Sequence, residues 1–555
     1  MGVISQPLHR RWPMRNPFTR LNSFAKACVG GVVILLFMFL ALNSDDTDFR
    51  RIWLSKTRPP VSSGHYKSGK VPLLDLAANS TPSWEAALSC NDDLDHLRRL
   101  KERYGLADQF EYFKRHVRVS RGDVKRKSLT DLKQTFAPDR FRLVDTGSSA
   151  YAERQSCPEP LEVHVSSSPF PSTANLSDFM FGVSTTYARF SDPKTSPVKE
   201  WSYWLTDSAG GPNGGKLVLL LVNATRDELN DAASQLGAVG IDADVFRADP
   251  DDIMAVRYMS LVPAMFKHPE RANKKWLVVC DDDTFFPSPH ALVETLAEMD
   301  PSQPLYVGTL SEDINNVQRH GSQAFGGAGV FLSVPLAREV SDRFASCSTE
   351  DKINESDSGW GPQGDIILRK CIYENTAVRM TNLGELWQID LTGDPSGFYE
   401  SGMRPLSLHH YRGGFWPVAH PFEYTKLSHL CGEDCMMQRF RTPDDWVLST
   451  SFSVVHYPRG TADLNMRQLE RTFAPAPDDK GWNFDYTFGP QRESLLRTGR
   501  KISWDLQEST VQLHQNDRMS VSQVYVRRQN DARWVDENET PMSSYDGVIE
   551  LVWVS

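Results

Sequence analysis

The sequence predicts an α/β fold, because apolar runs alternate with helical patterns in the middle of the chain. Between these runs, the apolar residues of 225–236 and 253–266 have helical spacing. Thr225 is a typical helix cap, and Asp227 and Glu228 would lie in the first turn of that helix. Such alternation is typical of a sheet covered by helices. The four runs with the length and composition of buried strands are residues 179–183, 217–222, 242–246 and 276–280.

A basic tail followed by an apolar run predicts a membrane anchor. Residues 1–26 contain five Arg or Lys and no Asp or Glu, residues 27–42 are apolar, and Asp45 and Asp46 follow closely. Because positive charge stays on the cytoplasmic side, we expect a type II protein whose chain after the anchor lies in the lumen of the secretory pathway. A cleaved signal peptide is the alternative, but its apolar core would be long and no small-residue cleavage site follows.

Cysteines and glycosylation sequons agree with a lumenal position. Cys431 and Cys435 are close enough for a local disulfide loop, whereas Cys90–Cys157 and Cys347–Cys371 are two of many permitted pairings. No cysteine spacing typical of zinc occurs. The remaining two cysteines lie in the apolar run and in a predicted strand, at positions 28 and 280. The sequons are at Asn79, Asn175, Asn223, Asn354 and Asn538.

Residues 43–170 predict a stem that contains a helical segment. Residues 57–82 are rich in Pro, Ser, Gly and Lys and have too few large apolar side chains for a core. From residue 84 to 136 the apolar residues lie near helical spacing, which predicts helices packed against the next domain. These residues are Leu94, Leu97, Leu100, Tyr104, Leu106, Phe110, Phe113 and Val117.

The α/β domain is placed at residues 171–435, after a Ser/Pro-rich linker at 166–173. Residues 436–555 form a carboxyl-terminal extension, in which the runs 447–455 and 548–554 predict strands. Nothing in the extension indicates a second catalytic site.

Composition fits a folded, membrane-tethered enzyme of two or three units. The chain has 555 residues, 40% hydrophobic and 24% charged, which is typical of globular proteins. The net charge of −10 argues against a nucleic-acid partner, for which a basic surface is expected. No P-loop or dinucleotide-binding glycine motif follows any predicted strand, so phosphate would have to be bound by other means.

An aspartate triplet, Asp281 to Asp283, follows the last of the four predicted strands. Open α/β sheets bind ligands at the carboxyl ends of their strands, and carboxylates are preferred ligands of Mg²⁺ and Mn²⁺. The triplet therefore predicts a cation site that holds a diphosphate. From the triplet alone, an acidic loop that caps a helix is an equally good interpretation.

Three later motifs carry further candidate groups. Phe325 begins a glycine-rich turn that leads into a strand, where missing side chains permit close approach of a ligand. Asp365 follows the flexible stretch that contains Trp360, and it is either a base or a helix cap. His409 and His410 would point to opposite faces of a strand, so only one of them would reach the aspartates; a structural histidine pair is the alternative.

Taken together and in this order, these motifs resemble the fringe-like glycosyltransferases of family 31, in particular the fungal and plant fringe-related branch. The resemblance spans about residues 179–411 and rests on WLVVCDDDT from Trp276, FGGAGV from Phe325, Gly364 with Asp365, and SLHH from Ser407. It implies a GT-A fold with a Rossmann-like mixed sheet, a Golgi membrane location, a UDP-sugar donor, Mn²⁺ or Mg²⁺, and an inverting transfer to a glycan or glycoprotein, usually with a β1,3 linkage.

The resemblance also implies roles for individual residues. Asp283 would be the direct metal ligand, together with a histidine of the doublet, of which His409 is favoured over His410 because the family's ligand follows an apolar residue. Asp365 matches the catalytic base, although family members commonly have an acidic neighbour where this chain has Gly364. The residues implied to position the donor are Asp281, Asp282, Thr185, Thr186 and Arg189. From the chemistry of transfer, Gly326, Gly327, Gly329 and Trp360 could shape the donor and acceptor pocket, and a tight turn with a core aromatic residue is an equally good interpretation of them.

Two other functions are compatible with the same motifs. A catalytically silent lectin-like or scaffolding protein would keep the fold, but the intact triplet, Asp365 and histidine doublet favour an enzyme. A hydrolase of nucleotide sugars would use Asp365 to activate water instead of an acceptor.

Overall fold

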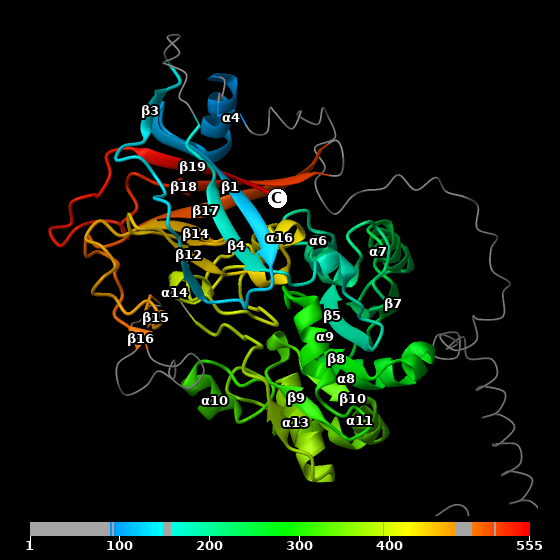
Figure 1. Ribbon diagram of the computed structural model, residues 1–555. Coiled ribbons are helices and arrows are strands. Elements are labelled where there is room, and N and C mark those ends of the chain that lie inside the picture. Colours follow the sequence, from blue (N-terminus) through cyan, green and yellow to red (C-terminus); the bar gives the residue numbers. More distant parts are fainter. Residues whose placement is uncertain (1–88, 91–93, 148–156, 392, 473–490, 515–517) are drawn as a thin grey trace, which may run out of the picture. The chain divides into compact units, whose positions relative to one another are not determined.

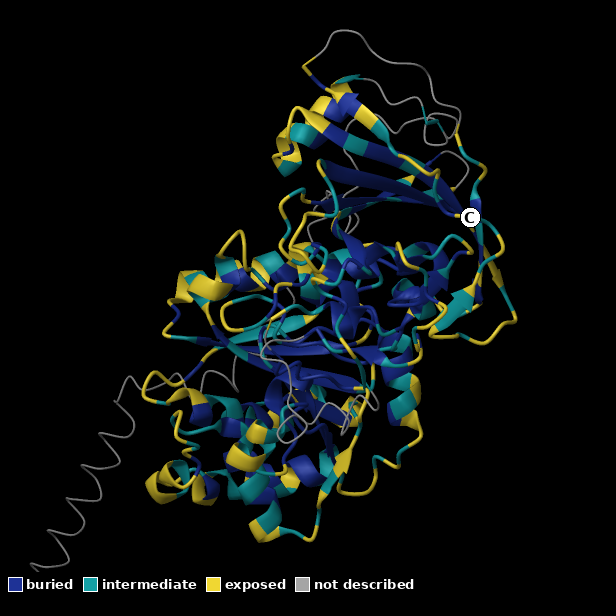
Figure 2. Cartoon of the chain, turned by 90° about the vertical axis from the view of Figure 1, so that its left-hand side faces the viewer, coloured by how far each residue is buried: buried dark blue, intermediate teal, exposed yellow. Residues whose placement is uncertain are grey.

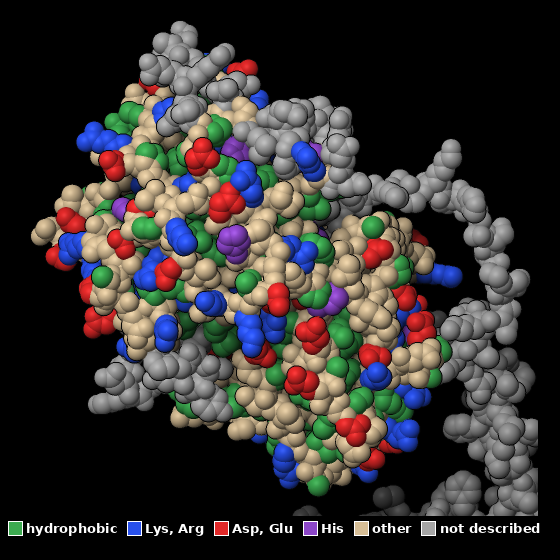
Figure 3. Space-filling view, viewed as in Figure 1, with side chains coloured by type: hydrophobic (Ala, Val, Ile, Leu, Met, Phe, Trp, Pro, Cys, Tyr) green, Lys and Arg blue, Asp and Glu red, His purple; other side chains and the backbone are tan. Residues whose placement is uncertain are grey.

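The computed structural model describes residues 89–90, 94–147, 157–391, 393–472, 491–514 and 518–555 (Figure 1). The described elements all belong to one compact unit of the chain. None of the helices in these ranges is long and apolar enough to cross a membrane, and the anchor predicted at residues 27–42 lies outside them. On the face in Figure 3, acidic and basic side chains are interspersed.

A seven-stranded mixed sheet forms the middle of the chain, in the order β11-β9-β10-β8-β5-β6-β7. β8, β5, β6 and β7 are parallel, and β10 is antiparallel to both β8 and β9. The α/β prediction is confirmed, including all four predicted strands. The strands are β5 (Phe179–Thr186), β6 (Lys216–Val222), β7 (Ala243–Arg247), β8 (Trp276–Val279), β9 (Tyr306–Gly308), β10 (Val330–Ser333) and β11 (Met380–Asn382).

Both faces of this sheet are buried at its centre, which explains why the central strands β5, β6 and β8 are mainly apolar. In β6, Leu217 and Leu219 belong to one core cluster, while Val218 and Leu220 belong to another on the opposite face. Helices α8 (Met254–Lys267), α11 (Val334–Cys347) and α13 (Gly364–Asn375) cover one face, and α6 (Val198–Leu205), α7 (Arg226–Ala238) and α9 (Pro289–Ala297) the other. Figure 2 shows the resulting layer of buried strands.

The two helices predicted from spacing are confirmed as α7 and α8. α7 begins with the expected cap, in which Thr225 and Glu228 each bind the other's backbone N–H group. The shorter helices are α5 (Tyr187–Ser191), α10 (Ile314–His320), α12 (Glu350–Asn354), α14 (Ser396–Tyr399), α15 (Pro421–Thr425) and α16 (Ser428–Cys431).

A second, ten-stranded sheet combines strands from both ends of the described chain, so the stem region and the carboxyl-terminal extension share one structure. β1 lies parallel to β19, and β2 lies parallel to β12 (Figure 1). The strands are β1 (Gln109–Gly122), β2 (Leu129–Asp131), β3 (Arg142–Asp145), β4 (Leu161–Ser166), β12 (Arg439–Arg441), β13 (Trp446–Ser449), β14 (Ser453–His456), β17 (Ile502–Leu513), β18 (Met519–Arg527) and β19 (Asp546–Val554).

The helical prediction for residues 84–136 is wrong beyond Tyr104. Helix α4 (Leu94–Tyr104) ends before Gly105, which has a φ of 58°, whereas Phe110, Phe113 and Val117 lie on β1. β1 is buried on both faces over much of its length, so its many apolar positions also match a helical period. Periodicity alone does not distinguish these two cases.

The three disulfides considered from the sequence are all present, linking Cys90 to Cys157, Cys347 to Cys371 and Cys431 to Cys435. The second joins α11 to α13 beside the seven-stranded sheet. Cys280 is free and buried. The four described sequon asparagines, Asn175, Asn223, Asn354 and Asn538, are all exposed.

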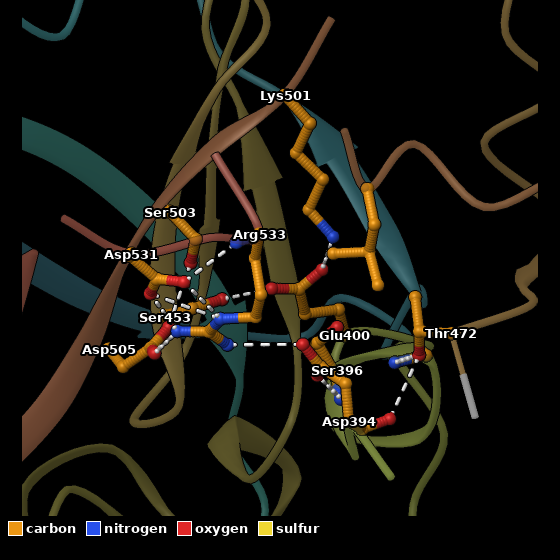
Figure 4. Close-up of polar contacts among 12 residues, drawn as sticks. Asp394, Ser396, Glu400, Ser453, Thr472, Lys501, Ser503, Asp505, Asp531 and Arg533 are labelled. Carbon is orange, nitrogen blue, oxygen red and sulfur yellow. Dashed lines mark hydrogen bonds and ion pairs between the residues drawn. The ribbon is translucent and has the colours of Figure 1, made fainter. Parts of the chain in front are cut away.

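Buried ion pairs tie the ten-stranded sheet to the segment that contains α14 (Figure 4). Nζ of Lys501 lies 2.6 Å from Oε2 of Glu400 and 3.0 Å from Oε2 of Glu470 (β15, Leu469–Glu470, paired with β16, Gln491–Arg492). Arg533 donates to Asp394 and Asp505. Arg533 is half-buried, whereas the Lys501 pairs are buried. Because an uncompensated buried charge is strongly destabilising, the pairs of Lys501 hold the segment in one position.

Candidate active site

The aspartate triplet leaves the sheet at the carboxyl end of β8 and is held there by the glycine-rich turn. The N–H of Asp281 donates to Oγ1 of Thr284 (3.0 Å), whose hydroxyl donates to the carbonyl of Gly327 (2.8 Å). Phe285 and Leu408 exchange backbone hydrogen bonds of 2.9 and 2.8 Å. This bridge brings the histidine doublet beside the triplet, although the two motifs are far apart in sequence.

Asp281, Asp283 and His409 form a compact group. Nε2 of His409 lies 3.0 Å from Oδ1 of Asp283 and 3.5 Å from Oδ2 of Asp281, and one ligand atom from each residue lies within 4.8 Å of the others. His409 is buried, with 3% exposed, whereas 44% of the Asp281 side chain is exposed. His409 therefore fixes the group in the protein core, and the side of the group that carries Asp281 is accessible to solvent.

Two other groups of potential ligands occur among the described residues, and neither suits a metal. One consists of the Cys90–Cys157 disulfide and His116. In the other, Nζ of Lys216 already lies 3.2 Å from both Asp244 and Glu270. A lysine ammonium group supplies the positive charge there.

The charges in the first group favour a cation between the two carboxylates. Desolvation alone would lower the pKa of His409, but the charges of Asp283 and Asp281 raise it to about 9. Desolvation acts to raise the pKa of Asp283, yet His409 lowers it below its usual range. Desolvation by the surrounding protein raises the pKa of Asp281 to about 7, against the influence of His409. A proton on His409 thus occupies the place that a divalent cation would take.

The donor set fits Mn²⁺ or Mg²⁺. Two carboxylates and one imidazole are hard and borderline ligands, and the open side of the group leaves room for oxygens of a phosphate or water. Nε2 of His409 is the nitrogen that faces the carboxylates. Asp281, Asp283 and His409 are therefore the residues that would hold the metal.

Asp282 points away from this group. It accepts hydrogen bonds from the hydroxyl of Thr185 and from Nε and Nη2 of Arg189, the latter two at 2.8 and 2.6 Å. Thr186 instead accepts from the N–H of Arg189 and caps α5. Of the residues predicted to position the donor, Thr185, Arg189 and Asp282 are brought together, Thr186 has a capping contact, and Asp281 lies with the cation group.

His410 pairs with Asp390 and not with an aspartate of the triplet. Its φ is 49°, and its Nδ1 lies 2.8 Å from Oδ1 of the buried Asp390. Its ring stacks on Trp416 with 3.9 Å between centroids and lies 3.8 Å from the ring of His409. The doublet does not lie on a strand, so the alternation expected of one does not apply, but within the described chain His409 alone of the two belongs to the group with Asp281 and Asp283.

The glycines of the turn permit close packing behind the site. A Cβ atom on Gly327 would lie 2.1 Å from the His409 ring, and one on Gly326 would lie 2.7 Å from the hydroxyl of Tyr258. Gly329 has a φ of 94°, which only glycine adopts readily. Gly326 and Gly327 thus support Tyr258 and His409, and their missing side chains are needed for that packing.

Replacing Gly327 by Ala is expected to prevent Mn²⁺ binding and to lower the free energy of unfolding by about 1–3 kcal/mol, because the new methyl group displaces His409. Isothermal calorimetry with Mn²⁺ and chemical denaturation would measure both effects. Gly237→Ala is a matched control, since a Cβ there meets nothing within 4 Å. Unchanged Mn²⁺ affinity in Gly327→Ala would contradict the prediction.

Asp365 lies in the first turn of α13, close enough to the cation group to raise the pKa of Asp281. Desolvation raises the pKa of Asp365 to about 6, against hydrogen bonds from the backbone of Gly326 and Ile366. Tyr258 packs beside it, and a Cβ on Gly364 would lie 2.5 Å from Cβ of Tyr258. This contact leaves no room for a side chain at position 364.

Trp360 lies on an exposed loop before α13. Its side chain is 73% exposed, and the guanidinium of Arg319 lies 5.3 Å from its ring centroid. Asp357 shapes this loop by accepting from the N–H groups of Gly359 and Gly361.

Several residues near the site were not found from the sequence. Arg412 donates to Glu200 and helps to lower the pKa of Asp283. Glu312 is fully buried and accepts from the N–H of Asp390, the partner of His410. Arg412 could have been suspected from the sequence, because it is a basic residue that closely follows the histidine doublet. No local pattern in the sequence indicates Glu312.

Comparisons with known proteins find one family match within the chain and several distant structural neighbours. No curated protein matches the chain. Similar solved structures include a mannosyltransferase from Pyrobaculum calidifontis in complex with GDP-Man and Mn²⁺ (11% identity, 39% of this chain and 59% of that one, TM-score 0.23) and mouse xyloside xylosyltransferase 1 (13% identity, 37% and 85%, TM-score 0.24). The chain thus spans less than two thirds of the first of these.

A family model described as Fringe-like matches residues 254–389, which include the aspartate triplet, the glycine-rich turn and Asp365. Since the TM-scores above are low, the assignment depends on this match. Residues 254–389 therefore match a Fringe-like domain.

Proposed function

We propose that the protein is a metal-dependent, inverting glycosyltransferase that moves a sugar from a UDP-sugar to a glycan or glycoprotein acceptor, with a β1,3 linkage. The observation that carries this proposal is the group of Asp281, Asp283 and His409, which is close enough to Asp365 for its charge to act on Asp281. Both aspartates of the group and Asp365 lie within the residues that match a Fringe-like domain. The group of Asp281, Asp283 and His409 suits a cation and its bound diphosphate. Asp365 is a carboxylate with a raised pKa, which suits a general base.

Asp365 acts as the base in this proposal. It accepts the proton of an acceptor hydroxyl while that oxygen forms a bond to the anomeric carbon of the donor. The bond from that carbon to the phosphate oxygen breaks on the opposite side, and UDP leaves with the electron pair. A single displacement of this kind inverts the anomeric configuration.

Bound Mn²⁺ or Mg²⁺ would supply Lewis-acid stabilisation of the diphosphate. The chain's own residues orient that end of the donor: Asp281, Asp283 and His409 hold the cation, and Asp282 fixes Arg189 through two hydrogen bonds. Arg189 and Arg412 place positive charge near the site, which favours the departing UDP.

A Golgi membrane location with the catalytic domain in the lumen is part of the proposal. The disulfides and the exposed sequon asparagines support an oxidising compartment that glycosylates proteins. The proposed anchor at residues 27–42 would tether the domain as a type II protein.

The acceptor-dependent rate is expected to fall about tenfold for each pH unit below about 6, because protonated Asp365 cannot accept the acceptor's proton. Above that pH the rate should level off. A pH profile of kcat/KM for the acceptor, corrected for the fraction of enzyme that binds UDP at each pH, would measure this. A rate independent of pH across this range would contradict the role of Asp365.

The proposed function is tested by UDP release from the full-length protein with Mn²⁺ and a panel of UDP-sugars. We expect one donor to give Mn²⁺-dependent release that increases when acceptor is added. Release that is equal with and without every acceptor would indicate a nucleotide-sugar hydrolase. If no donor turns over and calorimetry detects no Mn²⁺-dependent UDP binding, the protein is a silent relative of the family.

A further inference from the structure

The ring of His409 lacks the hydrogen bond that usually orients a metal-binding histidine. Its Nε2 faces Asp283 at 3.0 Å, and its other ring nitrogen, Nδ1, is buried without a hydrogen-bond partner in the described chain. In most metal sites that second nitrogen is held by a carboxylate or a backbone carbonyl, which fixes the direction of the ring. Packing against neighbouring residues is what the described chain offers in its place.

Two neighbours pack against this ring. Gly327 lies so close that a Cβ atom on it would be 2.1 Å from the ring. The ring of His410 lies 3.8 Å from that of His409 between centroids, and Trp416 stacks on His410 at 3.9 Å with 10° between the planes. The position of the His410 ring therefore limits the directions that the His409 ring can take.

His410 depends on Asp390 for its own position. The φ of His410 is 49°, in a region that residues other than glycine seldom adopt and keep only when the surrounding structure holds them there. Its Nδ1 lies 2.8 Å from Oδ1 of Asp390, and the Asp390 side chain is 4% exposed. A buried carboxylate thus contacts the histidine at the point where its backbone is unusual.

Asp390 is in turn fixed by the loop that follows β9. Its Oδ2 accepts hydrogen bonds from the hydroxyl of Ser311 (2.6 Å) and from Nδ2 of Asn316 (3.0 Å), and its N–H donates to Glu312 (3.2 Å). Strands β8 and β9 are both antiparallel to β10, so this loop and the aspartate triplet leave the sheet at the same edge. The contacts therefore form a continuous path from the β9 loop to the cation group.

We propose that Asp390 is a positioning residue of the cation group and acts through His410. Asp390 holds His410, and the His410 ring holds Nε2 of His409 toward the carboxylates. This inference rests on the metal dependence of the proposed function and adds two residues to it, neither of which would contact the metal. The alternative is that Asp390 attracts a cation only by its charge, without orienting His409.

A double-mutant cycle on the full-length protein separates these two cases, with Mn²⁺ affinity measured by calorimetry. Asp390→Asn keeps nearly the same shape but removes the charge that faces His410. His410→Asn removes the ring and introduces a residue that tolerates a positive φ. Each is expected to weaken Mn²⁺ binding about tenfold. The double variant should bind no more weakly than His410→Asn alone, because Asp390 acts through that ring.

The direction of His409 has a readout of its own. Pulsed electron paramagnetic resonance of bound Mn²⁺ should show a coupled imidazole nitrogen in the wild-type protein, and Asp390→Asn at saturating Mn²⁺ should weaken that coupling. Asp244→Asn is the matched control, since it changes an Asp–His contact of 2.7 Å on β7, at the opposite edge of the sheet. It should alter neither affinity nor coupling. His410→Asn gives the same test if Asp390→Asn does not fold.

The outcomes separate this inference from the proposed function. If the wild-type protein binds no Mn²⁺, the metal dependence of the proposed function fails and this inference fails with it. If the wild-type protein binds Mn²⁺ but Asp390→Asn and His410→Asn keep its affinity and nitrogen coupling, only the positioning role is overturned. An equal effect of Asp390→Asn in the presence and absence of His410 would also overturn it, because Asp390 would then act by charge alone.

Discussion

Asp283→Ala is expected to lower kcat/KM for sugar transfer by about 10³-fold or more, since it removes the buried carboxylate that would bind the metal and the closest partner of His409. Mn²⁺ binding, measured by calorimetry, should be lost as well. In the wild-type protein, Mn²⁺ should raise the midpoint of thermal unfolding, because a ligand that binds only the folded state stabilises it. That rise should be absent in the variant.

Asp282→Asn provides the matched control for this experiment. The side chain is next in sequence and similar in burial, but it pairs with Thr185 and Arg189 and not with His409. Mn²⁺ affinity should be retained in Asp282→Asn, while KM for the donor rises as Arg189 loses its fixed position. Equal loss of Mn²⁺ binding in both variants would show that the triplet acts as one acidic cluster. It would contradict the assignment of Asp283 to the metal and of Asp282 to Arg189.

Asp365→Asn is expected to lower kcat by about 10³-fold, because the amide cannot accept a proton from the acceptor hydroxyl. The replacement has nearly the same shape, so Mn²⁺ and UDP should still bind. Single-turnover transfer and UDP calorimetry on the same preparation would measure both quantities.

Two results would contradict this role for Asp365. A variant that keeps at least about a tenth of the wild-type rate would mean that another group accepts the proton. A variant that loses UDP binding would mean that Asp365 supports the donor site instead. Asp357→Asn is the matched control, since Asp357 lies on the loop before α13 and binds only backbone N–H groups of that loop.

The sequence was sufficient to predict the α/β domain because its signals are local. The central strands β5, β6 and β8 are mainly apolar runs, and Thr225 and Glu228 mark the start of α7 within four residues. The same is true of the order of motifs that indicated a cation site. What the sequence could not supply was the direction of each carboxylate, since Asp281 and Asp282 differ only in how the chain turns after β8.

The ten-stranded sheet was beyond sequence reasoning for a different reason. β1 pairs with β19 and β2 with β12, and no local pattern records which distant strand a given strand will join. The bridge between Phe285 and Leu408 is of the same kind, and it is what selects His409 over His410.

The pairing of β1 with β19 also sets a folding order during synthesis. β19 emerges from the ribosome more than four hundred residues after β1, which corresponds to a delay of roughly 20–90 s at usual rates of translation. All strands of the seven-stranded sheet are synthesised within that interval. The edge of β1 that pairs with β19 remains unpaired until β19 has been made. Newly made chains therefore present a partly apolar strand with one unpaired edge until late, and this edge is a potential site of aggregation that chaperones would have to cover.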